Sequence, residues 1–484
     1  MASATRTPPV ATPPEPDGGD SDQSSFVSGA RVLSVGIAST GIFTFAYLAT
    51  ASHVLDPASY SRISLCWAIM FVILSVIYRP IEQLLSRTIA DRRARGQSRH
   101  SLRVPAIIQT SFALIFLVAA LALRPQIEQG MFDGSTALYW ILVVGVMAYA
   151  ASYFARGWLA GNERFALYGA LVFLESTSRF LFALAVAVGI GSGQGVVGLG
   201  MAVAPFASLC VIPFAFAHLR VKPTANERAV PAVDAAGEGP AHAQFEEAAI
   251  AEVEAPGSGD LSLRHGAGFA VSVVGIMLSE QALMNAGVLI VAAKAGGGSL
   301  TGGLTGFVFN VMLIVRAPLQ LFQAIQTSIL PHLAGLEARE NAEEFHRAIR
   351  VTILAIAAFA SAVALGLLLI GPAVMTAFLG NKGFTYGRYG LALVGLGMGL
   401  HLVSGTLNQA ALARGRAVWA AAAWLVAATL FVIFVALPTI TSEVTRVEVG
   451  YFGATAVLCG LLTLVYRRGP ATPAPASAAA AIAA

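Results

Sequence analysis

The hydrophobic positions of this chain are gathered into long apolar segments that alternate with short polar connections. Twelve such segments of about 20 residues can be distinguished, and a helix of that length crosses the hydrocarbon core of a bilayer. Because lipid offers no partners for backbone polar groups, each segment is predicted to be a transmembrane helix. The segments cover residues 32–53, 63–84, 104–123, 137–156, 167–190, 196–217, 267–291, 303–329, 350–377, 389–411, 417–438 and 448–466.

The composition supports an all-α integral membrane protein and argues against a water-soluble enzyme. Hydrophobic residues make up 56% of the 484 positions and charged residues only 12%, against about 25% charged residues in soluble domains. The three cysteines lie in apolar runs, and no Walker-type phosphate loop or cluster of metal ligands is visible. We therefore expect no enzymatic activity, cofactor, metal site or nucleic-acid partner.

Polar stretches divide the predicted helices into two groups of six. Most of the 30 Lys and Arg residues fall in alternate connections, which places both termini in the cytoplasm by the positive-inside rule. We expect tails at residues 1–28 and 469–484, bundles at 29–217 and 266–468, and a flexible cytoplasmic tether at 218–265.

The two groups also resemble each other weakly in sequence. Arg79-Pro80 near the end of the second segment corresponds to Arg316-Ala317-Pro318 in the eighth, and the connection after the fourth segment corresponds to the one after the tenth. The matches are six segments apart, an even number, so the halves have the same orientation. Parallel repeats of this kind are a transporter architecture, with the substrate route between the halves.

A few ionisable residues lie inside the predicted membrane segments, where a charge needs a partner or a wet cavity. Glu175 and Arg179 are four residues apart and share one helix face, either as a self-neutralising pair or as cavity-lining groups. Glu280 has no cation four residues away and must pair across helices, become protonated or bind a cation. Arg316 lies too deep to reach the interface easily, whereas Arg79 lies nearer the cytoplasmic end.

Uncharged polar residues extend this pattern in the eighth segment. Asn310 precedes Arg316, and Gln320 and Gln323 follow it at a spacing that forms one stripe on a helix. Such a stripe suits sugar hydroxyls and phosphate oxygens, and it suits hydrogen bonding between helices equally well. His401 is interpreted as a hydrogen-bonded interior histidine.

Several loose motifs bear a resemblance to a known superfamily. The chain resembles the bacterial polysaccharide-transporter branch, the Wzx-like flippases, of the multidrug/oligosaccharidyl-lipid/polysaccharide (MOP) exporter superfamily. The resemblance covers about residues 29–466. It is carried by Leu55–Tyr60, Arg79-Pro80, Ser86-Arg87, Arg156-Gly157, Leu159–Phe165, Arg316–Pro318 and Ile329–Pro331.

The resemblance implies a MATE-like fold of twelve helices and a multi-pass protein of the bacterial cytoplasmic membrane. It implies a flippase that moves polyprenyl-pyrophosphate-linked oligosaccharide by alternating access, driven by an ion gradient. Glycosyltransferases and a polymerase of the same pathway would be its partners. Arg79, Arg179 and Arg316 would bind the pyrophosphate, because guanidinium forks match phosphate oxygens. Gln320, Gln323 and Asn310 would add substrate contacts, and Glu175 and Glu280 would exchange the coupling ion.

Two other functions stay open. A cation-coupled multidrug antiporter of the MATE type is favoured by Glu175 and Glu280, although the first segment carries no acid. A non-transporting scaffold for envelope glycan synthesis is suggested by the acidic tether. The flippase hypothesis predicts that the three arginines face a common chamber between the two bundles.

Overall fold

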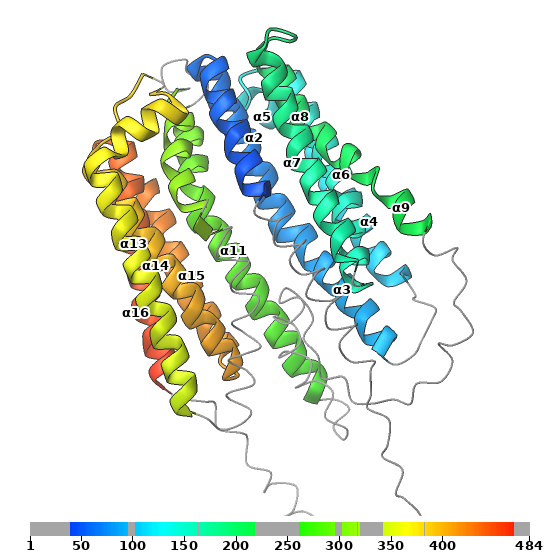
Figure 1. The fold of residues 1–484 in the computed structure, drawn as a ribbon, viewed down its shortest axis with the longest axis vertical. Coiled ribbons are helices and arrows are strands. Elements are labelled where there is room, and N and C mark those ends of the chain that lie inside the picture. Colours follow the sequence, from blue (N-terminus) through cyan, green and yellow to red (C-terminus); the bar gives the residue numbers. More distant parts are fainter. Residues whose placement is uncertain are drawn as a thin grey trace, which may run out of the picture.

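The computed structural model describes residues 39–94, 102–162, 164–217, 261–295, 303–316, 318–319, 342–381 and 383–468. Within these ranges the ordered elements are helical (Figure 1). They are the unlabelled helix 39–54, α2 (Pro57–Ile73), the π-helical turn η1 (Leu74–Tyr78), α3 (Arg79–Ala94), α4 (Arg103–Ala122), α5 (Arg124–Gly130), α6 (Thr136–Gly161), α7 (Phe165–Ala187), α8 (Gly193–Leu209), α9 (Ile212–Ala217), α11 (Leu261–Ala295), the unlabelled helix Gly303–Arg316, α13 (Ala342–Leu379), α14 (Arg388–Ala413), α15 (Ala417–Ala436) and α16 (Glu443–Arg467).

Ten helices in the described ranges are long and apolar enough to cross a membrane, which makes the chain a multi-pass integral membrane protein. The first and eighth predicted segments contain helices 39–54 and Gly303–Arg316, and the remainder of each lies largely outside the described residues. The predicted number of twelve therefore stays a prediction. Four helices begin several residues earlier than the apolar pattern indicated: α2 at Pro57, α11 at Leu261, inside the predicted tether, α13 at Ala342 and α16 at Glu443.

The helices form two groups that meet along α11 and α2 (Figure 1). In the N-terminal half, α6 packs against α3 and α8, and α7 packs against α8. In the C-terminal half, α14 packs against α13 and α16, and α15 packs against α11 and α16. Between the halves, α11 contacts both α2 and η1. The predicted bounds of the two bundles and of the tether stay a prediction.

Small residues allow the close approach of α6 to α3. A Cβ atom added at Gly157 would lie 2.6 Å from the Glu82 carbonyl oxygen, and one added at Gly161 would lie 2.6 Å from that of Ser86. The spacing of four places both glycines on one helix face, as in other close helix–helix contacts in membranes. The contact positions Arg156, one residue before Gly157, beside the core of the N-terminal half.

The hairpins after α6 and α14 have the same backbone hydrogen bonding. The N–H of Arg164 donates to the Leu159 carbonyl at 2.9 Å, and the N–H of Arg416 donates to the Ala411 carbonyl at 2.8 Å. The next helix begins in both cases with a bond to the arginine carbonyl, from Tyr168 and Ala420 respectively. This likeness agrees with the internal repeat that the two connections indicated in the sequence.

Candidate functional site

A cavity of about 80 Å³ lies between the two halves, and we call it the interface cavity. Its walls come from helix 39–54, α2 and α3 on one side, and from α11, Gly303–Arg316 and Leu319 on the other. The charged residues among its lining are Arg79, Glu280 and Arg316. Residues that the sequence placed in different spans and different halves therefore share one space.

Arg79 follows a local irregularity of the helix that proline explains. Pro80 has no N–H to give to the preceding turn, and the helix widens to the π form over Leu74–Tyr78. The Arg79 N–H then donates to the Leu74 carbonyl, five residues back. The widened turn changes the rotation of the helix at this point, and the half-buried Arg79 side chain lines the interface cavity.

Arg316 is buried, with 9% of its surface exposed, and is held by neutral groups. Its Nη2 donates to the Asn285 side-chain oxygen at 2.5 Å and to the Met284 carbonyl at 3.3 Å, while the guanidinium lies 4.7 Å from the Phe309 ring centre. Its Nε has no hydrogen-bond partner among the described residues. A buried arginine with donors to spare and no bonded carboxylate is suited to an anionic ligand.

Glu280 is the acid of the interface cavity. It lies on α11, five residues before Asn285, and lines the same space as Arg79 and Arg316. None of the ion pairs between described residues includes any of these three side chains. The lining of the cavity thus contains two basic groups and one acid, none of which forms an ion pair with a described residue.

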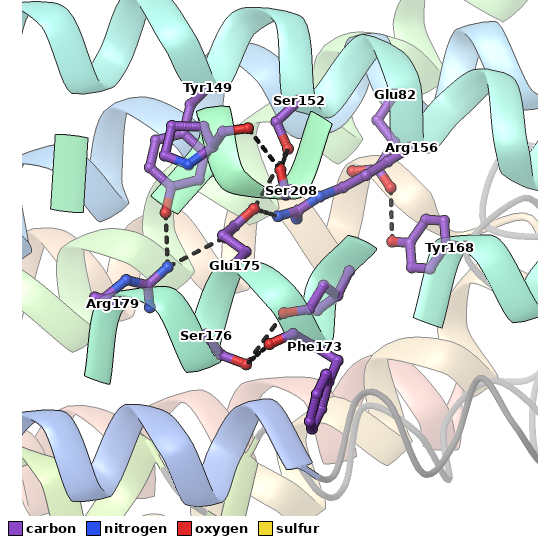
Figure 2. A network of polar contacts seen from close by, with 12 residues as sticks. Glu82, Tyr149, Ser152, Arg156, Tyr168, Phe173, Glu175, Ser176, Arg179 and Ser208 are labelled. Atoms are coloured by element: carbon purple, nitrogen blue, oxygen red, sulfur yellow. Dashed lines mark hydrogen bonds and ion pairs between the residues drawn. The ribbon is translucent and has the colours of Figure 1, made fainter. Parts of the chain in front are cut away.

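A second cavity of about 120 Å³ lies within the N-terminal half, and we call it the N-terminal cavity. Its charged lining residues are Arg156, Glu175 and Arg179, which form one network (Figure 2). The Arg179 Nη2 donates to Glu175 Oε1 at 3.1 Å and to the Tyr149 hydroxyl at 2.6 Å. Arg156 Nη2 donates to the other carboxylate oxygen, which also accepts from Ser152 Oγ at 3.3 Å.

Aromatic rings hold both guanidiniums of this network. Arg156 lies 4.5 Å from the centre of the Tyr153 ring, and Arg179 lies 4.6 Å from that of Trp67. Cation–π contacts of this kind fix a guanidinium face-on and leave its N–H edge directed elsewhere. The Nε atoms of Arg156 and Arg179 have no hydrogen-bond partner among the described residues. The network is therefore ordered, but part of its donor capacity is unused.

The two cavities adjoin each other. Thr44, Trp67 and Phe71 line both of them. The sequence predicted one chamber for Arg79, Arg179 and Arg316. The structure instead places Arg79 and Arg316 in the interface cavity and Arg179 in the N-terminal cavity, with Trp67 in the wall that they share. Glu175 is paired with Arg179, as the spacing of four indicated, and both line a cavity.

Asn310 lines neither cavity and belongs to a group of polar contacts that joins the halves. The Tyr60 hydroxyl donates to its side-chain oxygen at 2.5 Å, and its Nδ2 donates to the Tyr386 hydroxyl at 3.2 Å. Nearby, the Gly306 N–H donates to Ser61 Oγ at 2.9 Å, and Ser52 Oγ donates to the Leu379 carbonyl. We call these contacts the interface latch. They lie at the end of the molecule where α2 begins and α13 ends (Figure 1).

The remaining sequence predictions have varied outcomes. His401 is buried and its Nδ1 lies 2.9 Å from the Tyr451 hydroxyl, as expected for an interior histidine. Gln320 and Gln323 lie outside the described residues. Within the described ranges no group of three or more His, Cys, Asp or Glu side chains could hold a metal ion.

Several residues of the site were not found from the sequence. Arg156 is the last residue of the fourth predicted segment and was not singled out as a site residue, but it lies within α6 and is 9% exposed. Tyr149 carries no charge, and Trp67 lies in an apolar run, so the pattern gave no signal for them. Asn285 lies five residues after Glu280 on the same helix, and its polar side chain in an apolar segment was the signal that could have found it.

Comparison with known proteins identifies the fold. No protein-family model matches the sequence, and no curated protein matches it. Solved transporters match the structure. A mutant form of the Vibrio cholerae MATE transporter VcmN has a TM-score of 0.56 at 12% identity, over 93% of this chain and 98% of that one.

Two conformations of a multidrug transporter match about equally well. The inward-facing form of a multidrug resistance MATE family transporter of the MOP superfamily has a TM-score of 0.57 at 14% identity, over 89% of this chain and 94% of that one. An outward-facing form has a TM-score of 0.55, also at 14% identity, over 92% and 95%. The chain is a multi-pass membrane protein with the fold of the MATE transporters of the MOP superfamily.

Proposed function

We propose that this protein is a flippase for a lipid-linked glycan precursor, most simply a polyprenyl-pyrophosphate-linked oligosaccharide, in the bacterial cytoplasmic membrane. The observation that carries the proposal is the pair Arg79 and Arg316, which reach one cavity from opposite halves. Arg316 is buried there without a bonded carboxylate, so its charge is left for an anion from outside the chain.

Pyrophosphate fits the chemistry of this pair. Guanidinium groups bind phosphate oxygens bidentately, and each charge-assisted hydrogen bond contributes about 1.5–3 kcal/mol. Arg316 has its Nε available for such a bond, and Asn285 fixes the orientation of the guanidinium. A ligand bound to both arginines would connect the two halves, which is the property that alternating access requires of a substrate.

Glu280 supplies a means of release and of coupling. An ionised Glu280 competes with the phosphate for Arg79 and Arg316, whereas a protonated or sodium-bound Glu280 does not. An ionised Glu280 would thus favour release, and its protonated or sodium-bound form would favour the loaded cavity. The interface latch closes the halves at one end, and its opening would expose the cavity there. The glycan would be moved outward, with both termini of the protein in the cytoplasm. The pathway's glycosyltransferases would act before this step and its polymerase after it.

The test is transport of a fluorescent polyprenyl-pyrophosphate disaccharide in proteoliposomes. Arg79→Gln and Arg316→Gln should each lower the rate of transbilayer movement about 100-fold, since each removes two or more charge-assisted bonds. Arg124→Gln is the matched control, because Arg124 forms an exposed pair with Glu128 and lines neither cavity. Unchanged rates in the Arg316 variant at equal protein incorporation would contradict the proposal.

A cation-coupled multidrug antiporter is the second candidate. It is favoured by Glu280, which lines the interface cavity and forms no ion pair with a described residue. A cationic drug would pair with this acid. In that case Glu280→Gln should abolish the efflux of cationic dyes from whole cells while Arg316→Gln preserves it. Unchanged dye sensitivity on deletion of the gene would exclude this function.

A further inference from the structure

Arginines gather at one end of the C-terminal half, where α13 and α15 begin and α14 and α16 end (Figure 1). They are Arg347, Arg350, Arg414, Arg416, Arg467 and Arg468. The described residues of these helix ends include two acids, Glu343 and Glu344, both at the start of α13. The chain has no Asp or Glu from residue 388 to 442 or from 449 to 484. The end that α14, α15 and α16 form is therefore positively charged and contributes no acid of its own.

Arg414 fixes the arrangement of this end. Its buried guanidinium lies 4.4 Å from the centre of the Phe345 ring and 5.0 Å from that of the Tyr466 ring, and its Nη1 donates to the Tyr466 carbonyl at 3.2 Å. Phe345 belongs to α13 and Tyr466 to α16, so one side chain after α14 joins three helices. A surface that is ordered in advance loses less conformational entropy when a ligand binds.

Arg416 and Arg468 lie in one small area of this surface, although both are positively charged. The Arg416 Nη2 donates to the backbone carbonyl of Arg468 at 3.2 Å. The Arg468 guanidinium lies 5.6 Å from the centre of the Trp419 ring, and Trp419 is 55% exposed. Two like charges in one area repel each other, and an anion bound there removes the repulsion. The location therefore favours an anionic ligand that also has an apolar part.

The surface of α15 and α16 that continues from these arginines is apolar and open. Val418 and Trp419 are exposed at the start of α15, and Leu464 is exposed one turn before Arg468 on α16. A Cβ atom added at Gly460, a further turn away, would have no heavy atom within 4 Å. A soluble anion would contact the arginines alone, whereas the acyl chain of a lipid would cover this surface as well. Basic side chains and tryptophan at the end of a membrane helix are typical of the headgroup level.

We propose that the end of α16 and the connection between α14 and α15 form a binding site for an anionic phospholipid of the adjacent leaflet, of which phosphatidylglycerol is the simplest example. Arg416 and Arg468 bind its phosphodiester, and an acyl chain lies along Leu464 and Gly460. The bound lipid compensates the positive charge that the chain itself leaves without an acid at this end. The site is separate from both cavities, and the inference holds whatever cargo the protein carries.

Arg124 is the matched control, because it has a similar aromatic contact and an acid of its own. Its guanidinium lies 5.8 Å from the centre of the Trp140 ring, as Arg468 lies beside Trp419. Its Nε also donates to Glu128 at 2.9 Å. Since this acid already compensates the charge, substitution of Arg124 should leave lipid binding unchanged.

The experiment measures lipid binding to the purified full chain in a neutral detergent by native mass spectrometry. Phosphatidylglycerol and phosphatidylcholine with the same acyl chains are titrated separately. The tightest site of the wild type should prefer phosphatidylglycerol about 30-fold, which is about 1 kcal/mol for each of the two arginines. The double variant Arg416→Gln/Arg468→Gln should bind both lipids about equally, whereas Arg124→Gln should keep the preference of the wild type. Inorganic phosphate should not displace the bound phosphatidylglycerol.

Equal affinity of the wild type for the two lipids, or an unchanged preference in the double variant, would overturn the proposal. Displacement by inorganic phosphate would assign the arginines to a soluble anion and would overturn it too. Should the double variant fail to fold because Arg416 loses its bond to the Arg468 carbonyl, Arg468→Gln alone keeps that backbone acceptor. It should lower the preference about fivefold, and a preference equal to that of the wild type would count against the site.

Discussion

The two cavities differ in how the charge of a buried arginine is compensated. In the N-terminal cavity Glu175 lies between Arg156 and Arg179 and bonds to both. In the interface cavity Arg316 rests on the neutral side chain of Asn285, and Glu280 makes no ion pair with a described residue. Burial is similar in the two places, since Arg156 and Arg316 are each 9% exposed. What differs is whether the protein itself supplies the opposite charge.

The difference follows from which parts of the molecule contribute to each cavity. The N-terminal cavity is built from one half, so its charges keep their distances when the halves separate. The interface cavity takes Arg79 from one half and Arg316 and Glu280 from the other, so its charges change distance in the same motion. A ligand shifts a conformational equilibrium only by binding the two states differently. The interface cavity can therefore respond to the motion, whereas the charges of the N-terminal cavity keep the same arrangement in each state.

The largest effect is expected from substitution of Glu175, the acid that Arg156 and Arg179 share in the N-terminal cavity. Glu175→Ala should lower the free energy of unfolding by about 3–5 kcal/mol, because it leaves two buried guanidiniums without their counter-charge. Thermal unfolding in detergent, followed by the fluorescence of a thiol-reactive dye, measures the loss. Glu280→Ala is the matched variant in the interface cavity and should change stability by less than about 1 kcal/mol, because no ion pair is lost. Equal losses in the two variants would show that the cavities do not differ in this respect.

Replacement of one arginine from each cavity by methionine sharpens the contrast. Arg179→Met removes bonds to Glu175 and Tyr149, whereas Arg316→Met removes a buried cation that has no bonded acid. The first variant should be less stable than the second by about 2–3 kcal/mol. Chemical unfolding of both proteins in the same detergent gives the difference. A more stable Arg179→Met protein would mean that the Glu175 network does not stabilise the fold.

The sequence predicts the helices well because apolar length alone determines them. Ten of the predicted segments correspond to membrane-length helices among the described residues, although α2, α11, α13 and α16 begin before their apolar runs. These extensions are polar turns that hydropathy cannot distinguish from a loop. The pair Glu175 and Arg179 was also predictable, since it depends only on a spacing of four within one helix.

The composition of the two cavities could not be predicted, because it depends on contacts between helices. Arg156 reaches Glu175 from another helix, and its place near the end of an apolar run gave it the pattern of a cytoplasmic loop residue. Arg316 was recognised as deep, but its partner Asn285 lies on α11. The division into two spaces depends on Trp67, which hydropathy treats as one more apolar residue. Only packing assigns these side chains their roles.

The interface latch allows the mobility of the two cavities to be compared directly. Tyr60→Phe removes the donor of the buried bond to Asn310 and should favour separation of the halves at that end by about 1–2 kcal/mol. Labelling of an introduced cysteine by a membrane-impermeant thiol reagent measures this. The labelling rate should rise about 5- to 30-fold at Gly41→Cys, in the interface cavity, and should change little at Met201→Cys, in the N-terminal cavity.

A matched tyrosine provides the control for that measurement. The buried Tyr139 hydroxyl donates to the Ala120 carbonyl at 3.0 Å, within the N-terminal half. Tyr139→Phe removes a comparable bond without touching the contact between the halves, so labelling at both cysteines should stay as in the parent protein. A rise at Met201→Cys in the Tyr60 variant would show that the N-terminal half does not move as a unit.

The smallest effect is expected at Asp56, which lies outside both cavities and measures how much an ordinary polar contact contributes. Its carboxylate accepts from the Ala58 and Ser59 N–H groups at 3.0 Å and caps α2. Burial raises the pKa of Asp56, but these hydrogen bonds outweigh it and hold the pKa below its usual value of 3.8. Asp56→Ala should cost about 1 kcal/mol at pH 7.

The pKa of Asp56 is lower in the folded protein than in the unfolded chain, and this determines the pH range in which its carboxylate stabilises the fold. The stabilisation by Asp56 is fully present above about pH 4 and is lost as the pH falls through the lowered pKa of the folded protein. The stability difference between wild type and Asp56→Ala should thus be constant from about pH 5 to 8 and shrink towards about pH 3. If instead Asp56→Ala destabilises as much as Glu175→Ala at pH 7, a single exposed cap contributes as much as the buried network. The difference in stability between the variants of the two cavities would then mean that the N-terminal half is destabilised by any substitution. It would not depend on whether a buried arginine has a bonded carboxylate.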